Sequence, residues 1–210
     1  MVSGPGCCVS PRNSERLLSH KKENLVEKEC IRRIRERLAY GESENPWVRL
    51  YFDDVMKPGG PGRYNRVVEG GDGTGPGVVI VPVTTSQRIV FVRVFRYPVS
   101  RWLTELPRGF GEPGLDGASN ASKELLEETG LRSESVALLG RIYPNTGLLA
   151  TEVQVFRADA VAEASAKPCL SECISEVLFL SREQIERCIR QGDIADGITL
   201  SALSMCWLSG

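Results

Sequence analysis

One segment limits the possible folds of this chain more than any other: residues 106–131, with the sequence LPRGFGEPGLDGASNASKELLEETGL. A glycine-rich loop leads there into a run typical of a helix, and Gly130 marks the helix end, since glycine is the usual residue just past a C-terminus. Residues three and four positions apart share a helix face, so Glu124, Glu127 and Glu128 lie together. Three carboxylates one turn apart repel each other unless a cation neutralises them. The segment therefore predicts either a solvated acidic face or a site for a hard divalent cation.

The rest of the chain mixes strand-like runs and helices without regular βαβ alternation. Strands are predicted where β-branched and aromatic residues concentrate between turn residues, over residues 47–55, 64–69, 78–83, 89–95, 136–141, 152–158 and 175–180. Helices are predicted over residues 118–129, 181–190 and 196–208, and residues 104–114 are predicted to be a loop. We therefore expect an α+β fold in which a mixed sheet lies between helices.

Two further segments precede this body. Residues 1–14 are rich in Gly, Ser and Pro and are predicted to be disordered. Residues 14–40 are highly charged with a narrow apolar stripe, which predicts a helical arm. The arm either packs on its own domain or on a partner chain, or is a solvated surface helix. We place the domain boundary between residues 1–45, the start and arm, and residues 46–210.

The charge balance and the rarity of histidine exclude several classes of function. With 26 basic and 27 acidic residues and a net charge of −1, the chain as a whole does not attract nucleic acid or an anionic membrane. His20 is the one histidine, which argues against Ser-His-Asp catalysis, Cys-His catalysis and histidine-based zinc sites. Acid-base or metal chemistry must therefore rest mostly on carboxylates.

The cysteines and the apolar runs indicate the compartment. Seven cysteines occur without a pair of CxxC motifs, and no apolar run approaches membrane-spanning length. Residues 1–10 do not resemble a signal peptide. We therefore expect free thiols and a cytoplasmic location.

The acidic segment resembles the box of the Nudix hydrolase family, G-x5-E-x7-R-E-U-x-E-E-x-G-U, where U is apolar. Gly109 opens the match, and residues 123–131 close it at the family's spacing. Leu115 stands where the family has its first glutamate, and Lys123 where it has arginine. Glu112 lies close to Leu115 in sequence but off the motif position. Lysine keeps the charge of arginine and lacks its planar fork, so we expect a working but weaker or slower site.

This resemblance implies a Nudix-type α/β/α sandwich and a reaction that depends on Mg²⁺, with Mn²⁺ as the alternative ion. It implies that Glu124, Glu127 and Glu128 are the metal ligands. The cation would neutralise the charge of a diphosphate and polarise a P–O bond. A carboxylate would take a proton from the attacking water, and the candidates are Glu127, Glu172 and Glu152.

The flanks of the box, RVFRYPVSRWLTELPRG and YPNTGLLATEVQVFRA, resemble those of ADP-ribose and nucleoside-diphosphate-sugar pyrophosphatases. By that resemblance, Arg96 would reach the diphosphate or terminal ribose of the substrate, and Glu105 would contact its nucleotide side. Arg108 joins them as a substrate-binding residue, and its carbonyl would add a metal ligand. The implied reaction is Mg-dependent hydrolysis of a nucleoside diphosphate linked to a sugar, with ADP-ribose giving AMP and ribose 5-phosphate. Members of this branch are commonly homodimers that exchange N-terminal elements, so a homodimer is expected.

Three other interpretations stay open. A Nudix-fold nucleotide-binding or regulatory module with a degenerate box is favoured by Leu115. An enzyme of the same fold could instead act on coenzyme A, a diadenosine polyphosphate or an oxidised nucleotide. The third is an unrelated α+β protein with an acidic helix, which requires the glycines, the glutamates and the order of elements to coincide by chance.

Overall fold

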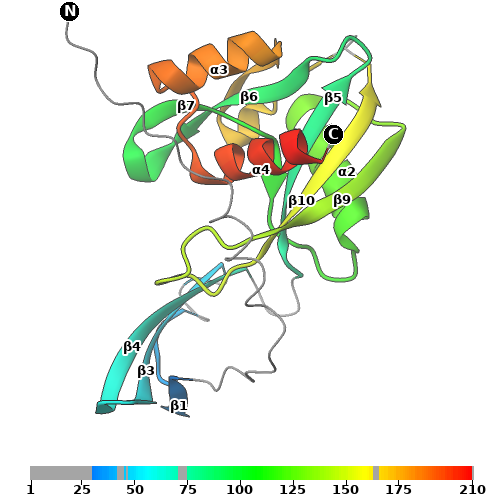
Figure 1. The fold of residues 1–210 in the computed structure, drawn as a ribbon. Coiled ribbons are helices and arrows are strands. Elements are labelled where there is room, and N and C mark those ends of the chain that lie inside the picture. The colour runs from blue at the N-terminus through cyan, green and yellow to red at the C-terminus, as the bar shows by residue number, and fades with distance from the viewer. Residues whose placement is uncertain (1–29, 42–44, 46, 71–74, 163–165, 210) are drawn as a thin grey trace, which may run out of the picture.

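The computed structural model describes residues 30–41, 45, 47–70, 75–162 and 166–209, and in these ranges the chain forms two sheets (Figure 1). The larger sheet has the strand order β11-β6-β5-β10-β9, with β7 added beside β6 and β8 beside β5. Its strands are β5 (Gly77–Thr84), β6 (Ile89–Arg96), β7 (Arg101–Glu105), β8 (Arg108–Gly109), β9 (Ser135–Ile142), β10 (Val153–Val161) and β11 (Ile174–Leu180). Because β5 and β10 are parallel while the other pairs are antiparallel, the sheet is mixed, as predicted.

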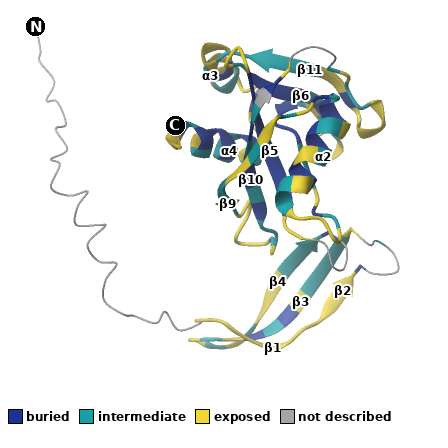
Figure 2. Ribbon diagram, turned by 90° about the vertical axis from the view of Figure 1, so that its right-hand side faces the viewer, coloured by how far each residue is buried: buried dark blue, intermediate teal, exposed yellow. Residues whose placement is uncertain are grey.

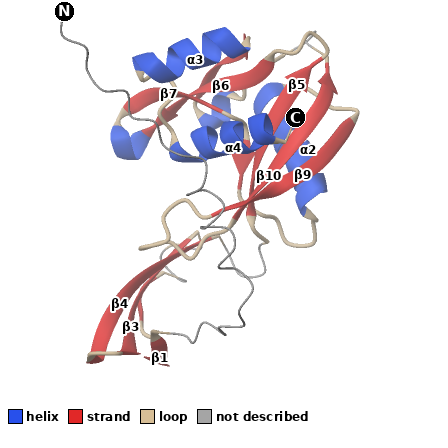
Figure 3. Cartoon of the chain, viewed as in Figure 1, coloured by secondary structure: helices blue, strands red, loops and turns tan. Residues whose placement is uncertain are grey.

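Helices cover both faces of this sheet. They are α2 (Gly117–Thr129), α3 (Arg182–Gln191) and α4 (Gly197–Leu208), and two short 3-10 turns are η2 (Tyr97–Val99) and η3 (Leu170–Glu172). Figures 1 and 3 show α4 across one face and α2 behind the opposite face. None of the described helices is long and apolar enough to cross a membrane. The predicted α/β/α sandwich is confirmed.

The core forms on two sides because side chains alternate along the central strand β5. Val79 and Val81 pack in a cluster with residues of α3 and α4, while Val78 and Ile80 pack in a second cluster with residues of α2. Every residue of β5 is buried (Figure 2). A strand covered on both faces reads as a continuous apolar run, which is why VVIVPV was recognisable in the sequence.

The helix ends follow local rules. Asp116 caps α2 by accepting a hydrogen bond from the backbone N–H of Ser119, 2.8 Å away. Asp196 caps α4 in the same way through Thr199, also at 2.8 Å. Gly130 ends α2 as predicted, and its φ of 72° is the left-handed conformation that favours glycine.

The smaller sheet corrects the prediction for the N-terminal arm. It consists of β1 (Arg32–Arg35), β2 (Leu38–Tyr40), β3 (Val48–Lys57) and β4 (Gly60–Glu69), and it projects away from the sandwich (Figures 1 and 2). The helix predicted over residues 14–40 is therefore wrong for residues 32–40. Both short strands pair with β3, and this non-local pairing overrides the local helical pattern. The rest of the predicted arm and the predicted disordered start, up to residue 29, lie outside the described residues, and the domain boundary stays a prediction.

The predicted loop over residues 104–114 contains short strand segments. Glu105 ends β7, and β8 is two residues long. Its Gly109 lies opposite Val78 of β5, and Arg108 lies opposite Val79. This pairing brings the start of the loop against the centre of the sheet, next to α2.

Candidate active site

A cavity of about 1030 Å³ opens where α2, the loop after β8 and the smaller sheet meet. Its charged lining residues are Glu69, Arg96, Arg108, Glu112, Lys123, Glu124, Glu127, Glu128 and Glu172. Trp47, the residue before β3, also lines it, and its ring stacks on that of Phe110 at 6.2 Å between centroids. The cavity therefore combines carboxylates, cationic side chains and an aromatic pair.

The helix α2 and the strand β8 lie against each other at Gly109. A Cβ atom built on Gly109 would lie 2.1 Å from the carboxyl carbon of Glu124, far inside van der Waals contact. The glycine therefore leaves the space that the Glu124 carboxylate occupies. This close approach explains physically why the segment has glycine at this position.

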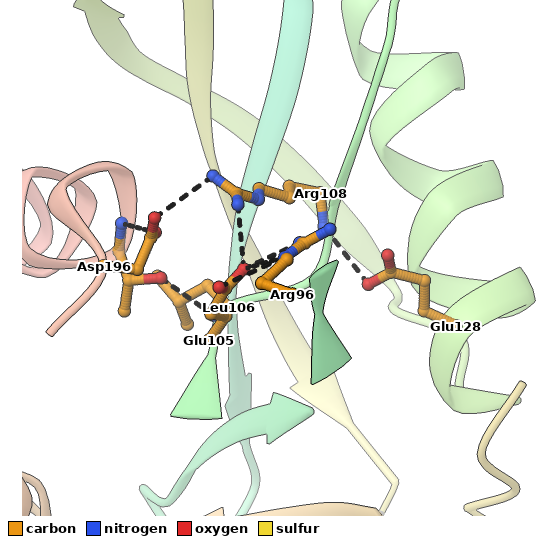
Figure 4. A network of polar contacts seen from close by, with 7 residues as sticks. Arg96, Glu105, Leu106, Arg108, Glu128 and Asp196 are labelled. Atoms are coloured by element: carbon orange, nitrogen blue, oxygen red, sulfur yellow. Dashed lines mark hydrogen bonds and ion pairs between the residues drawn. The ribbon is translucent and has the colours of Figure 1, made fainter. Parts of the chain in front are cut away.

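Glu124 and Glu128 are buried, at 8% and 5% exposure, although both line the cavity. The backbone N–H of Arg108 donates to Oε2 of Glu128 at 3.2 Å (Figure 4). The Glu124 carboxylate has no hydrogen-bond partner among the described residues. Neither carboxylate forms an ion pair within the described part of the chain. Two neighbouring buried carboxylates of this kind fit a site that receives a cation from outside.

Burial changes the acidity of both groups. It raises the pKa of Glu124 to about 7, with Glu127, Glu172 and Glu112 adding to the rise and Lys123 opposing it. Burial likewise raises the pKa of Glu128 to about 8, helped by the charges of Glu172 and Glu124. When no cation neutralises its charge, each carboxylate takes up a proton as the pH falls through about 7 for Glu124 and about 8 for Glu128.

These raised pKa values predict how stability depends on pH. In the unfolded chain both carboxyl groups have the usual pKa of 4.5, whereas in the folded chain their pKa values are about 7 and 8. The folded state therefore holds these protons more tightly, and the stability that they contribute is lost as the pH rises through about 7 and 8. With a chelator present, the melting temperature should fall by several degrees between pH 5.5 and 8.5. Thermal unfolding followed by circular dichroism measures this, and Mg²⁺ should raise the melting temperature more at the higher pH.

The matched control for this pH dependence is Glu128→Gln, which removes the more strongly shifted carboxyl. Its melting temperature should change less over the same range. Equal slopes in the variant and the natural chain would contradict the assignment.

Glu127, the third predicted ligand, is arranged differently. Its side chain is 44% exposed and pairs with Lys123, four residues earlier on the same helix. Nζ of Lys123 also contacts Oε1 of Glu112 at 2.8 Å. Among the described residues, no three His, Cys, Asp or Glu side chains already stand arranged around a common metal position. Glu127 would therefore have to turn from Lys123 toward a cation to join Glu124 and Glu128.

A second network holds the two arginines of the cavity (Figure 4). The Glu105 carboxylate accepts two hydrogen bonds from Nε of Arg96, at 3.2 and 3.1 Å, and one from its Nη2 at 2.7 Å. Nη2 of Arg108 contacts the same carboxylate at 2.9 Å, and its Nη1 contacts Asp196 at 3.4 Å. Burial alone would lower the pKa of Arg96, but Glu105, Glu128 and Asp196 together outweigh burial and the pKa is raised. Both guanidinium groups are thus held by the same Glu105 carboxylate.

The remaining predicted site residues divide into two groups. Glu172, at the end of η3, lines the cavity and contributes charge to both Glu124 and Glu128. Glu105 is fully buried and is not a lining residue. Its carboxylate pairs with Arg96 and Arg108. Glu152 is not a lining residue either; it accepts a hydrogen bond from the Tyr143 hydroxyl at 2.9 Å and pairs with Arg141.

Sequence reasoning missed several parts of the site. The cap spacing of Asp196 and Thr199 was readable, and Thr199 also accepts a hydrogen bond from the backbone N–H of Leu106, 3.1 Å away. No local pattern indicated that Trp47 would meet Phe110, because 63 residues separate them in the chain. The contact between Lys123 and Glu112 was likewise missed.

Comparison with known proteins gives a consistent result. The family model described as NUDIX domain matches residues 73–197. An ADP-ribose pyrophosphatase of Bacillus subtilis (strain 168) is 28% identical over 158 residues, covering 74% of this chain and 83% of that protein. A CMP-5'-(N-acetyl-N-hydroxy-3-aminopropyl)phosphonate hydrolase of Streptomyces rubellomurinus (strain ATCC 31215) is 28% identical over 169 residues, covering 80% and 79%. The crystal structure of an ADP compounds hydrolase superposes with a TM-score of 0.70 at 16% identity, covering 86% of this chain and 95% of that one, so the fold is shared.

Proposed function

Since the chain belongs to the NUDIX domain family and is a hydrolase of pyrophosphate bonds, we propose that its substrate is a nucleoside diphosphate linked to a sugar. ADP-ribose is the first candidate, and its products would be AMP and ribose 5-phosphate. The observation that carries this proposal is one cavity in which two buried glutamates and two fixed arginines are combined. The similarity to an ADP-ribose pyrophosphatase and to a hydrolase of a CMP-linked phosphonate supports a nucleotide substrate.

Glu124 and Glu128 are the central ligands of the proposed metal, and Glu127 completes the set after it leaves Lys123. When bound, Mg²⁺, with Mn²⁺ as the alternative, neutralises the charge of the diphosphate and activates its phosphorus toward water. The raised pKa values of Glu124 and Glu128 support this assignment, because each carboxylate is costly to leave ionised in a buried site without a cation.

The general base in this proposal is Glu172. It lines the cavity, is exposed to solvent and lies close enough to both buried glutamates to raise their pKa values. A carboxylate in this position can take a proton from the attacking water. Glu127 is the second candidate, and Glu152 is disfavoured because it pairs with Arg141 and Tyr143 outside the lining of the cavity.

The substrate is held by Arg96 and Arg108 in this proposal. Guanidinium groups bind phosphate oxygens through paired hydrogen bonds, and both side chains line the cavity. Glu105 fixes their orientation, which replaces its expected contact with the nucleotide. The stacked rings of Trp47 and Phe110, 57% and 47% exposed, offer a flat apolar surface for a nucleobase.

A homodimer is the proposed assembly, with the smaller sheet in the interface. Large apolar side chains that soluble proteins normally cover are exposed on this part of the chain: Ile31, Ile34, Leu38, Tyr40, Phe52, Met56 and Tyr64. No nucleic acid or membrane partner is proposed. Cys30, Cys169, Cys173, Cys188 and Cys206 are free thiols in the described ranges, which supports the proposed cytoplasmic setting.

One observation favours the alternative of a regulatory nucleotide-binding module. Leu115, which replaces the first glutamate of the box, is 40% exposed and supplies no carboxylate. Such a module would bind the nucleotide without hydrolysing it.

The decisive experiment measures turnover directly. The purified chain is incubated with Mg²⁺ and a panel of ADP-ribose, other nucleotide sugars, diadenosine polyphosphates, coenzyme A and oxidised nucleotides, and released monophosphates are quantified. ADP-ribose should be hydrolysed best. The double variant Glu124→Ala, Glu128→Ala should have an activity at least about 10³-fold lower than that of the natural chain. Glu186→Ala, on the far helix α3, is the matched control and should retain full activity.

Each other outcome identifies an alternative. Nucleotide binding without turnover on any compound would favour the regulatory module. If another compound of the panel were hydrolysed best, that compound would be the substrate in place of ADP-ribose. Full activity in the double alanine variant would rule out the proposed site.

A further inference from the structure

Lys123 occupies a position between two carboxylates that both face the cavity. Its Nζ contacts Oε1 of Glu112 at 2.8 Å and pairs with the carboxylate of Glu127. Glu112 belongs to the loop before α2, whereas Glu127 lies one turn along the same helix as Lys123. All three side chains are partly exposed, at 34% for Lys123, 42% for Glu112 and 44% for Glu127. The ammonium group therefore links the loop to the helix at the cavity wall.

This arrangement makes Lys123 a competitor for any cation that binds Glu127. An ammonium and a divalent ion attract the same carboxylate oxygens, and only one of them can occupy the same side of the carboxylate. When Glu127 turns to a cation, the charge of Lys123 lies close to that cation and repels it. A second carboxylate that pairs with the Lys123 ammonium and keeps it in place reduces the effect of this repulsion on cation binding.

We propose that Glu112 is a positioning residue that retains Lys123 when Glu127 turns toward a divalent cation. In this arrangement Glu112 never needs to touch the cation or the substrate. It makes up for the carboxylate that Leu115 does not supply, from a position three residues earlier. The inference rests on the proposed function, because it assumes that the cavity binds a divalent cation.

The loop geometry supports this assignment over a direct role for residue 115. The backbone N–H of Leu115 donates to the Glu112 carbonyl at 3.3 Å, so the two residues are the ends of one turn. Within that turn, the side chain that reaches Lys123 is that of Glu112.

The test is a double-mutant cycle read by metal binding rather than by turnover. Binding of Mn²⁺ to the full chain is measured by electron paramagnetic resonance of the free ion, for the natural chain, Glu112→Gln, Lys123→Met and the double variant. Glu112→Gln should weaken binding by about three- to tenfold, in the range of a partly exposed ion pair. In the Lys123→Met background the same substitution should change the dissociation constant by less than about twofold, because no ammonium is left to retain.

Two results would overturn the inference. Equal weakening in both backgrounds would mean that Glu112 acts on the cation directly, and an unchanged dissociation constant in Glu112→Gln would mean that it has no role. Glu186→Gln, which removes a carboxylate of similar exposure that pairs with Arg182 on α3, is the matched control and should bind Mn²⁺ like the natural chain. Glu112→Asp keeps the charge and should stay within about threefold of the natural chain.

A relocated carboxylate gives an independent test. Glu112→Gln combined with Leu115→Glu moves the acid to the position that the family box uses, and should recover at least half of the lost binding energy. No recovery would contradict the view that Glu112 compensates for Leu115. If the natural chain itself binds no Mn²⁺, the proposed function fails and this inference fails with it. Equal weakening in both backgrounds overturns the inference alone, so the two failures are distinguishable.

Discussion

Replacing Gly109 by alanine is expected to lower kcat/KM for ADP-ribose, the proposed substrate, by about 10²–10³-fold, although it adds only one methyl group. The added Cβ would lie 2.1 Å from the Glu124 carboxyl carbon, so the carboxylate must move by about 1 Å or more. Displacements of this size at a reacting centre typically cost about 10²-fold in rate. The measurement is released AMP at saturating Mg²⁺, together with Mn²⁺ binding, which should weaken in parallel.

Gly59→Ala is the control for the glycine substitution. Gly59 lies in the turn of the smaller sheet, and a Cβ atom there meets nothing within 4 Å. Activity should stay within about twofold of the natural chain. If Gly109→Ala retained full activity with unchanged Mn²⁺ binding, the close approach of Gly109 to Glu124 would have no functional meaning.

The second large effect is expected for Glu105→Gln, which removes one charge and keeps the shape of the side chain. Glu105 is 1% exposed and holds Arg96 and Arg108, whose side chains are 34% and 20% exposed. Removing one partner of a buried ion pair commonly costs 3–5 kcal/mol, and the partial exposure of both arginines reduces this to about 2–3 kcal/mol. Urea denaturation should report that loss in the free energy of unfolding.

The same variant should also change catalysis in a specific way. The arginines keep their charge but lose their fixed orientation, so KM for ADP-ribose should rise about tenfold. Glu186→Gln, which breaks the exposed pair with Arg182, should lower stability by less than about 0.5 kcal/mol and leave KM unchanged. A variant at Glu105 that is as stable as the natural chain, with the same KM, would show that the arginines are positioned by other contacts.

Much of the fold was readable because local signals agree with the tertiary structure. Most strands and helices of the sandwich were predicted close to their observed bounds. The signals were the apolar run of β5, the glycine at the end of α2, and the turn residues between the strand-like runs. The helix predicted over residues 32–40 was wrong, because β1 and β2 exist only by pairing with β3. The residue pattern of β1 and β2 alone does not show that β3, from another part of the chain, lies beside them and pairs with them.

The candidate site divides in the same way. The helical spacing of Glu124, Glu127 and Glu128 was sufficient to predict that they share a face. It could not separate the two that are buried against the loop from Glu127, which pairs with Lys123. Burial depends on which residues cover a helix face. Here Gly109 lies against Glu124, and the backbone N–H of Arg108 donates to Glu128.

A glycine loop followed by an acidic helix is a local pattern with fixed periodicity. The amino-acid sequence was therefore sufficient to identify the segment that we propose carries the chemistry. Which carboxylates line the cavity depended on the folded arrangement. Glu172 lines it, Glu152 pairs outside its lining, and Glu105 is enclosed by two arginines. The folded arrangement also decided that Glu112 reaches Lys123. The physical reason is that the charge state and the role of a carboxylate depend on its burial and on its partners. Those partners come from strands and loops distant in the chain, brought together by folding.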